Sequence, residues 1–215
     1  MVAWSAQVAA AASAPEAVPS VRIIRFEDIK PKDARITTCW DALGIDAEQR
    51  VYVALSDQSR EHPFDTLIFR YDTRTDQREL LGTLRQISEA EGNLLEGETI
   101  AKIHVPFHEH AGKFYFSSHD YHTYDGRADL VKHRGGHFYS YDLATGKFSD
   151  LSKTEPAGVS VPQQGIIGLA VLPEQNLLAG LTFPFGDLVI YDLQRGTSTF
   201  YQGVEEHRAR GKPTR

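Results

Sequence analysis

Residues 137–147, HFYSYDLATGK, decide the fold, because an apolar run ends there in the dipeptide Tyr-Asp and a turn follows at once. The same pattern appears in residues 67–77, LIFRYDTRTDQ, and in residues 188–197, LVIYDLQRGT. Upstream of each copy lies a second turn that is followed by a second apolar run. A pattern that recurs at a fixed period indicates that one supersecondary unit has been copied several times.

The upstream turns set the period of the repeat. Gln49, Gly112 and Gln175 hold equivalent places in these turns and lie 63 residues apart both times. Enrichment in β-branched and aromatic residues, near-alternation and turn residues at the breaks predict four short strands in each unit. The predicted strands are 36–43, 50–56, 66–71 and 78–84 in the first unit, 101–107, 113–118, 137–141 and 147–151 in the second, and 165–172, 177–182, 187–192 and 197–201 in the third. Helical periodicity is weak throughout, and residues 86–95 are the best candidate for a short helix.

Four antiparallel strands repeated as a unit are typical of the blade of a β-propeller. The Tyr-Asp turn and the strands before it resemble secreted bacterial β-propellers of the YVTN and Kelch-like kind, the seven-bladed type, over about residues 30–203. This resemblance implies an all-β fold with three four-stranded blades in a partial ring, within a propeller region that spans residues 21–203. The expected blades are residues 30–84, 99–152 and 163–203.

A propeller ring usually has four blades or more, so three units predict an incomplete ring. Residues 21–29, VRIIRFEDI, are a candidate outer strand of a preceding blade. The chain is then either a piece of a longer propeller or a unit that self-associates through its open edges. The first alternative is favoured, because an open arc exposes strand edges and apolar blade faces, which proteins normally avoid.

The composition excludes several classes of protein. The chain has 215 residues, of which 41% are hydrophobic, and this is enough for one domain with a core. Cys39 is the single cysteine, so neither an internal disulfide nor a cysteine-rich metal site is expected. A net charge of −6 without a basic block gives no reason to expect a nucleic-acid partner. No run approaches the roughly 18–20 apolar residues that a membrane-spanning helix needs.

The two ends of the chain differ from the repeats. Residues 1–20 are rich in alanine and serine, and residues 12–14, Ala-Ser-Ala, fit the pattern of a signal-peptide cleavage site. The positive region that usually precedes such a site is missing, so this stretch is either the remnant of a secretion signal or a disordered leader. The first alternative predicts a secreted or periplasmic protein. Residues 204–215 are polar and are expected to form a tail.

The middle unit has the longest loops. Residues 120–136 enlarge the connection between its second and third strands, and the loop before its first strand, residues 85–99, is also long and acidic. In propellers that this chain resembles, both loops lie on one face, which usually binds ligands. Loops that grow on one face of a rigid scaffold are typical of a functional surface. Drift in tolerated surface loops is the alternative explanation.

Seven of the nine histidines lie between residues 104 and 137. His104 and His119 are the leading candidates for a catalytic pair, because a neutral imidazole can accept a proton or bind a metal near physiological pH. In the 63-residue alignment, His119 takes the place of Ser56 and Thr182. His104 is expected near the mouth of the central channel, and His119 at the end of the adjacent strand. A hydrogen-bonded structural histidine is the alternative at each position.

Further candidates come from the same loops and strands. Tyr121 and Arg134 complete the predicted catalytic group, as a proton donor and as a cation that neutralises a substrate carboxylate. Loop packing and surface solvation are the alternatives for these two residues. Four other residues on the same predicted face are candidates for ligand binding. They are His122, Tyr124, His137 and Gln163.

One pair of histidines predicts a metal site. His108 and His110 form an H-x-H pair, and in a strand both side chains lie on the same face, as a metal site requires. They are expected toward the face opposite the long loops. A divalent metal is the cofactor that such a pair would hold, although no third ligand is identified in the sequence.

These residues support two functions of different classes. The first is a binding domain that presents a histidine- and tyrosine-rich loop face to a carbohydrate or protein ligand. The second is a polysaccharide lyase, since some propeller lyases that act on uronate polymers use histidine, tyrosine and arginine on the channel face. The sequence is similar to those lyases in residue types rather than in a motif. No nucleophile elbow, phosphate-binding loop or dinucleotide-binding fingerprint is present.

Overall fold

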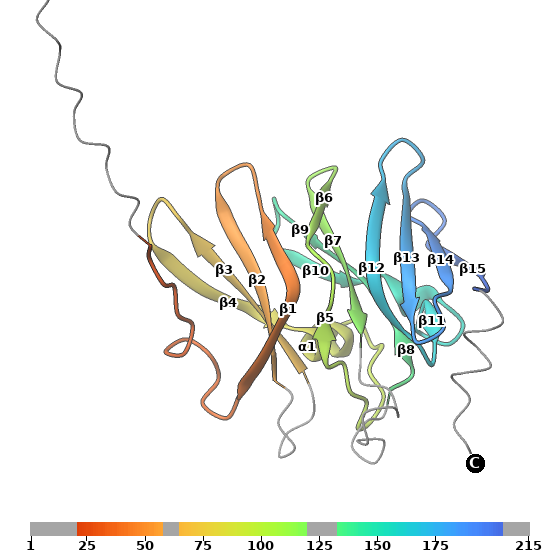
Figure 1. Cartoon of the computed structure of the whole chain (residues 1–215), viewed down its shortest axis with the longest axis horizontal. Coiled ribbons are helices and arrows are strands. Elements are labelled where there is room, and N and C mark those ends of the chain that lie inside the picture. Colours follow the sequence, from red (N-terminus) through yellow and green to blue (C-terminus); the bar gives the residue numbers. More distant parts are fainter. Residues whose placement is uncertain (1–20, 58–64, 120–132, 204–215) are drawn as a thin grey trace, which may run out of the picture.

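Three antiparallel sheets lie side by side in a fan in the computed structural model of this chain (Figure 1). The structure describes residues 21–57, 65–119 and 133–203. Each sheet corresponds to one predicted unit, so the chain is all-β and forms three blades of a β-propeller. Among the described residues the blades make a partial ring, as the sequence predicted.

The first blade is a sheet in which each strand pairs with the next one in the sequence. Its strands are β1 (Ile36–Ile45), β2 (Arg50–Asp57), β3 (Asp65–Asp72) and β4 (Gln77–Thr83). Every neighbouring pair is antiparallel. The four predicted strands of this unit are confirmed, with bounds that move by one or two residues.

The second blade departs from the predicted pattern at its inner edge. Its strands are β5 (Lys102–Ile103), β6 (His108–His110), β7 (Lys113–His119), β9 (Phe138–Asp142) and β10 (Lys147–Asp150). The single predicted strand 101–107 is wrong, because the chain leaves the sheet between β5 and β6. Pro106 lies in this gap and has no backbone N–H to donate to the ladder. The backbone N–H of Phe107 instead donates to the carbonyl of Leu43 in the first blade.

The third blade has the regular order again. Its strands are β12 (Gly165–Leu172), β13 (Leu177–Phe183), β14 (Leu188–Asp192) and β15 (Thr197–Tyr201). Two short strands, β8 (Gly135–Gly136) and β11 (Val161–Pro162), pair with each other in a sheet of their own. They link the segment that enters β9 of the second blade to the segment that enters β12 of the third.

The repeat period differs from the one read in the sequence. Arg50, Lys113 and Leu177 each begin the second strand of a blade and each pair with the aspartate of Tyr-Asp. The residue just before each of them has a positive φ, and for the third blade this residue is Asn176 rather than Gln175. The structural spacing is therefore 63 and then 64 residues. The turn before the second strand has two residues in the middle blade and four in the others. Because of this difference in turn length, the change in spacing from 63 to 64 residues is not visible in the sequence pattern.

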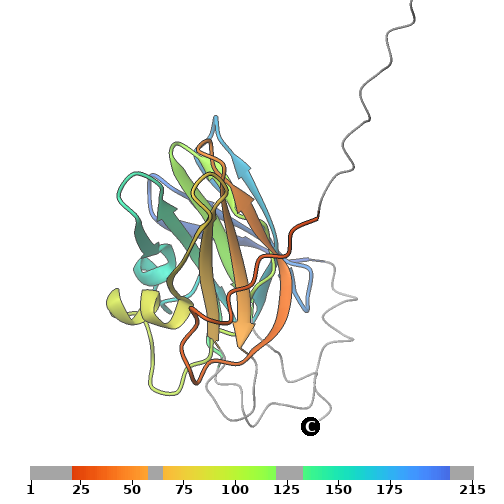
Figure 2. The same ribbon diagram turned by 90° about the vertical axis from the view of Figure 1, so that its left-hand side faces the viewer.

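Two short helical turns lie at the edge formed by the outer strands (Figure 2). Helix α1 (Leu84–Ala90) begins with a capping box, in which Thr83 caps the backbone N–H of Gln86 and the side chain of Gln86 caps Thr83 in return. The predicted helix 86–95 therefore exists, but it starts earlier and ends earlier. The 3₁₀ helix η2 (Leu151–Thr154) begins at the cap Asp150. No helix among the described residues is long and apolar enough to cross a membrane.

Residues 21–29 are not a strand, so the prediction of an outer strand from a preceding blade is wrong for this structure. The segment instead lies across the outer half of the first blade. The ring of Phe26 packs on Phe69 of β3 with centroids 4.7 Å apart. Arg78 of β4 donates to Asp28 and to the carbonyl of Arg25. These contacts explain how Phe69 becomes fully buried although it faces away from the second blade.

Two apolar clusters fill the spaces between the blades. The first lies between the first and second blades and contains Tyr52, Phe116 and Tyr139, the last two stacked with centroids 5.5 Å apart. The second lies between the second and third blades and contains Phe138 and Ile166, both fully buried. Burial of large apolar rings between sheets is the main term that holds neighbouring blades together.

Candidate functional site

A row of aromatic and imidazole rings crosses all three blades near their first strands. Trp40 of β1 stacks on His104, with ring centroids 4.9 Å apart. His104 meets the edge of His119 at 5.7 Å, and His119 meets the edge of Phe183 of β13 at 5.6 Å. Lys102 of β5 places its ammonium 3.9 Å from the centre of the Trp40 ring. We call these five residues the inner cluster.

A bulge in β1 positions Trp40. Cys39 pairs with Leu55 and Leu43 pairs with Val53, so three residues of β1 oppose one residue of β2. Bulges of this kind bend a strand and re-aim its side chains, and they are common next to functional sites. Here the bulge holds the indole where the ammonium of Lys102 can make a cation–π contact.

A glycine in the third blade makes room for His119. A Cβ atom at position 165 would lie only 1.8 Å from Nδ1 of His119, so the imidazole ring occupies the space that any other residue would fill. Gly165 pairs with Phe183 across the sheet, which explains why His119 reaches the phenyl ring. In the structural alignment His119 takes the place of Ser56 and Phe183, and the predicted equivalence with Thr182 is wrong by one residue.

The inner cluster combines exposed rings with protected imidazoles. Trp40 and Phe183 are 37% and 40% exposed, whereas His119 is 6% exposed. Burial lowers the pKa of His104, and the positive charge of Lys102 lowers it further, so this imidazole is neutral at neutral pH. The structure thus brings together the two leading candidates, His104 and His119, beside two aromatic surfaces that a ligand can reach.

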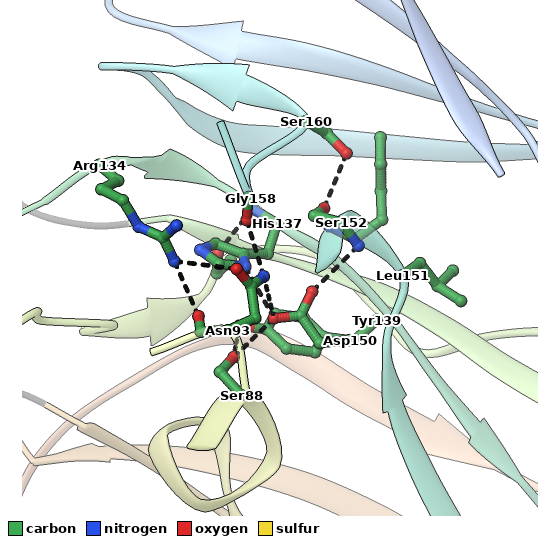
Figure 3. A network of polar contacts seen from close by, with 12 residues as sticks. Ser88, Asn93, Arg134, His137, Tyr139, Asp150, Leu151, Ser152, Gly158 and Ser160 are labelled. Atoms are coloured by element: carbon green, nitrogen blue, oxygen red, sulfur yellow. Dashed lines mark hydrogen bonds and ion pairs between the residues drawn. The ribbon is translucent and has the colours of Figure 1, made fainter. Parts of the chain in front are cut away.

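Two other predicted site residues belong to a buried polar network (Figure 3). His137 is 1% exposed, and its Nδ1 lies 3.0 Å from a carboxylate oxygen of Asp150. Its Nε2 lies 3.9 Å from Glu98, close enough for an ion pair. Burial alone would lower the pKa of His137, but the two carboxylates outweigh burial and raise it. The imidazole therefore contacts protein carboxylates rather than solvent.

Arg134 completes this network. Its Nε donates to Glu98 at 2.8 Å, and its other nitrogens donate to the carbonyl oxygens of Ala157 and Asn93. Burial would raise the pKa of Glu98, but His137 and Arg134 outweigh burial and lower it to about 2. The guanidinium thus stays with an ionised carboxylate of the protein. A substrate carboxylate at this position would have to compete with Glu98.

Asp150 is the centre of the network and is fully buried. It accepts hydrogen bonds from Ser88 of α1, from the side chain of Asn93 and from the backbone N–H of Ser152. Tyr139 lies 3.0 Å from the hydroxyl of Ser88. These bonds pin the loop 85–99 to the second blade, so this loop is held by charges and hydrogen bonds at its base.

The predicted metal pair shares a face, but it gains no third ligand from the part of the chain that the structure describes. His108 and His110 pair with Tyr115 and Lys113, and Glu109 between them is exposed. His108 is held by the backbone of Leu169 in the third blade, and burial lowers its pKa. Among the described residues, no group of three or more acidic, histidine or cysteine side chains could hold a metal ion.

The remaining candidates are placed only in part. Gln163 is exposed, has a positive φ of 58°, and donates its backbone N–H to the carbonyl of Arg134. Tyr121, His122 and Tyr124 lie outside the described residues.

The sequence did not identify four residues of the inner cluster and the buried polar network. Trp40 and Lys102 were not singled out, because only the bulge in β1 and the break after β5 bring them together. Glu98 and Asp150 were read as loop and strand-end residues. No local sequence signal identifies them, because Glu98 lies 36 residues from Arg134 and Asp150 lies 13 residues from His137.

Comparisons with known proteins add little to this description. No protein-family model matches the sequence, and no curated protein matches it. Among solved structures, the chain is similar to a chain in the "Crystal structure of Nidogen/Laminin Complex", with 8% sequence identity and a TM-score of 0.44. The match covers 77% of this chain and 48% of the other, so this chain spans about half the length of the solved one. The assignment of the fold rests on the strand pairing described above.

Proposed function

We propose that this chain is a binding domain of the β-propeller type that takes a carbohydrate on its inner cluster. The observation that carries the proposal is the row from Trp40 through His104 and His119 to Phe183, whose two end rings are more than a third exposed. An exposed aromatic face binds the apolar face of a sugar ring, and imidazole and ammonium groups nearby bond its hydroxyls. The Ala-Ser-Ala pattern in residues 12–14 supports export from the cytoplasm, where such ligands are common.

A glycan array followed by titration tests this function. Binding should quench or shift the fluorescence of Trp40, measured in a Trp4→Phe background so that one indole reports. Trp40→Ala should weaken binding of the best glycan at least tenfold, because the stacking surface is removed. Phe200→Ala is the matched control, since Phe200 is 38% exposed on the outer strand β15. The proposal is wrong if no glycan binds, or if Trp40→Ala and Phe200→Ala bind alike.

One observation favours the lyase as a second candidate. His104 is held neutral by burial and lies beside a second imidazole, which suits a general base. In this reaction the base takes the proton from the carbon next to the uronate carboxylate. The electron pair forms a carbon–carbon double bond as the bond to the leaving sugar oxygen breaks. The ammonium of Lys102 lies in the inner cluster beside Trp40, whereas Arg134 lies in the buried network with Glu98.

Ultraviolet absorbance separates the two functions. Elimination creates an unsaturated uronate that absorbs, so incubation with uronate polysaccharides should give a rising signal that His104→Ala abolishes. A glycan that binds at Trp40 without any rise in absorbance would remove the lyase and leave the binding domain.

A further inference from the structure

The two interfaces inside the fan use the same strand positions. Tyr52 of β2 and Tyr115 of β7 hold equivalent places, and each packs against the next blade in the chain. Phe114 of β7 and Leu178 of β13 are also equivalent, and each packs against the preceding blade. Each blade therefore has one face for the blade that follows it and another for the blade that precedes it.

The following-blade face of the third blade has no partner among the described residues, and it is apolar. Leu181 of β13 pairs with Leu188 of β14, which pairs with Tyr201 of β15, so the three side chains form one row across the sheet. They are 49%, 42% and 54% exposed. Contiguous apolar exposure of this kind is typical of an interaction surface.

The preceding-blade face of the first blade is open along its inner half. Leu43 and Ile45 of β1 are 58% and 59% exposed and pair with Val53 and Val51, so they lie on the face turned away from the second blade. The outer half of this face is covered by the segment that carries Phe26. The first and third blades therefore each have an open apolar face. Faces of the same kind pack against a neighbouring blade in the two interfaces inside the fan.

We propose that a second copy of this chain covers both faces. The third blade of each copy packs against the first blade of the other, which repeats the inner part of the contact between consecutive blades, while the segment with Phe26 covers the outer part. Propeller rings typically have four to eight blades. Two copies would bring together six blades, a number within this range. A head-to-tail interface that closes after two copies leaves no open face and no growing fibre.

The first test is the mass of the wild-type chain in solution. Light scattering or sedimentation over a range of concentrations should give twice the 24.0 kDa of one chain at high concentration, with reversible dissociation on dilution. A mass of 24.0 kDa at every concentration would overturn the proposal, and it would indicate that sheets of another polypeptide cover these faces.

Substitutions then identify the faces. Leu181→Arg on the third blade and Ile45→Arg on the first should each weaken dimerisation tenfold or more, because a charge enters both symmetry-related interfaces. Both side chains are exposed, so the fold should tolerate the change, as circular dichroism can verify. Leu95→Arg is the matched control, since Leu95 is 55% exposed and lies on neither face. An equal effect of this control would contradict the proposal.

Mixing the two variants gives the sharpest result. The Ile45→Arg copy keeps an intact third blade and the Leu181→Arg copy keeps an intact first blade, so the mixture should form heterodimers through one unaltered interface. A symmetric contact between two third blades would instead leave Ile45→Arg dimeric and the mixture monomeric in part. That outcome would refute the head-to-tail arrangement. Glycan binding by the monomeric variants would show whether the inner cluster works independently of the dimer.

Discussion

Glu98 is a buried carboxylate whose negative charge is expected to contribute to the stability of the fold. Its side chain is 2% exposed, bonded to Arg134 at 2.8 Å and 3.9 Å from the imidazole of His137. These contacts lower its pKa from the ordinary 4.5 to about 2. A difference of about 2.5 pKa units, at 1.36 kcal/mol each, corresponds to about 3 kcal/mol of stability at neutral pH. Glu98→Gln keeps the shape of the side chain and should lose about this amount.

The loss also has a defined dependence on pH. A group whose pKa is lowered by folding stabilises the protein above its unfolded pKa, and the stabilisation disappears as the pH falls through the folded value. The wild-type protein should therefore lose about 3 kcal/mol from Glu98 between about pH 5 and pH 2. Glu98→Gln should show an acid slope that is shallower by this amount. Urea unfolding followed by fluorescence, repeated across this range, measures both quantities.

Glu79→Gln is the control for this experiment. Glu79 also pairs with an arginine, Arg70, but its side chain is 55% exposed. Exposed ion pairs contribute about 0–1 kcal/mol, so this variant should be nearly as stable as the wild type. The reasoning fails if both variants lose the same stability at neutral pH, or if Glu98→Gln keeps the acid slope of the wild type.

Two further predictions concern a glycine and a histidine. Gly165→Ala should destabilise the protein by several kcal/mol, because its Cβ would collide with His119, while Gly112→Ala should cost only about 1 kcal/mol, since Gly112 has a φ of 73° in open space. Thermal melts compare the two variants, and a smaller effect at Gly165 would contradict the packing described. The pKa of His137 is raised above 6.5, so its stabilisation is complete below that pH and is lost as the pH rises through the folded value. A proton NMR titration of the imidazole should give a value above 6.5, and a lower value would show that the two carboxylates do not hold the charge.

Local patterns were sufficient to predict most of the strands and their division into three sheets of antiparallel strands. Alternation, turn residues and the repeated Tyr-Asp all act within one hairpin, so a single sequence contains them. The break around Pro106 was missed because the alternation continues through it. The one-residue shift of the repeat at Asn176 was missed, because the turns before the second strands differ in length while the spacing between the units stays nearly constant.

The candidate site was predicted less completely than the strands, because tertiary contacts between blades bring its residues together. His104 and His119 meet as a pair because two strands of the second blade and Gly165 of the third bring them together. Trp40 joins them through a bulge, which has no clear sequence signal. The buried charges of Glu98 and Asp150 arise from a loop that folds back over a blade, and composition alone treats both as surface residues.

Strand β13 connects the two proposals. It ends at Phe183 in the inner cluster, and two residues earlier it carries Leu181 on the open face. If a second copy packs on Leu181, the backbone of β13 is held from that side while His119 holds its end from the other. Ligand affinity should then rise with dimerisation, and by reciprocity the ligand should strengthen the dimer by the same factor. Trp40→Ala tests the glycan proposal at a residue of the inner cluster, and Leu181→Arg tests the dimer on the open face of the third blade, so a failure of one proposal can be distinguished from a failure of the other.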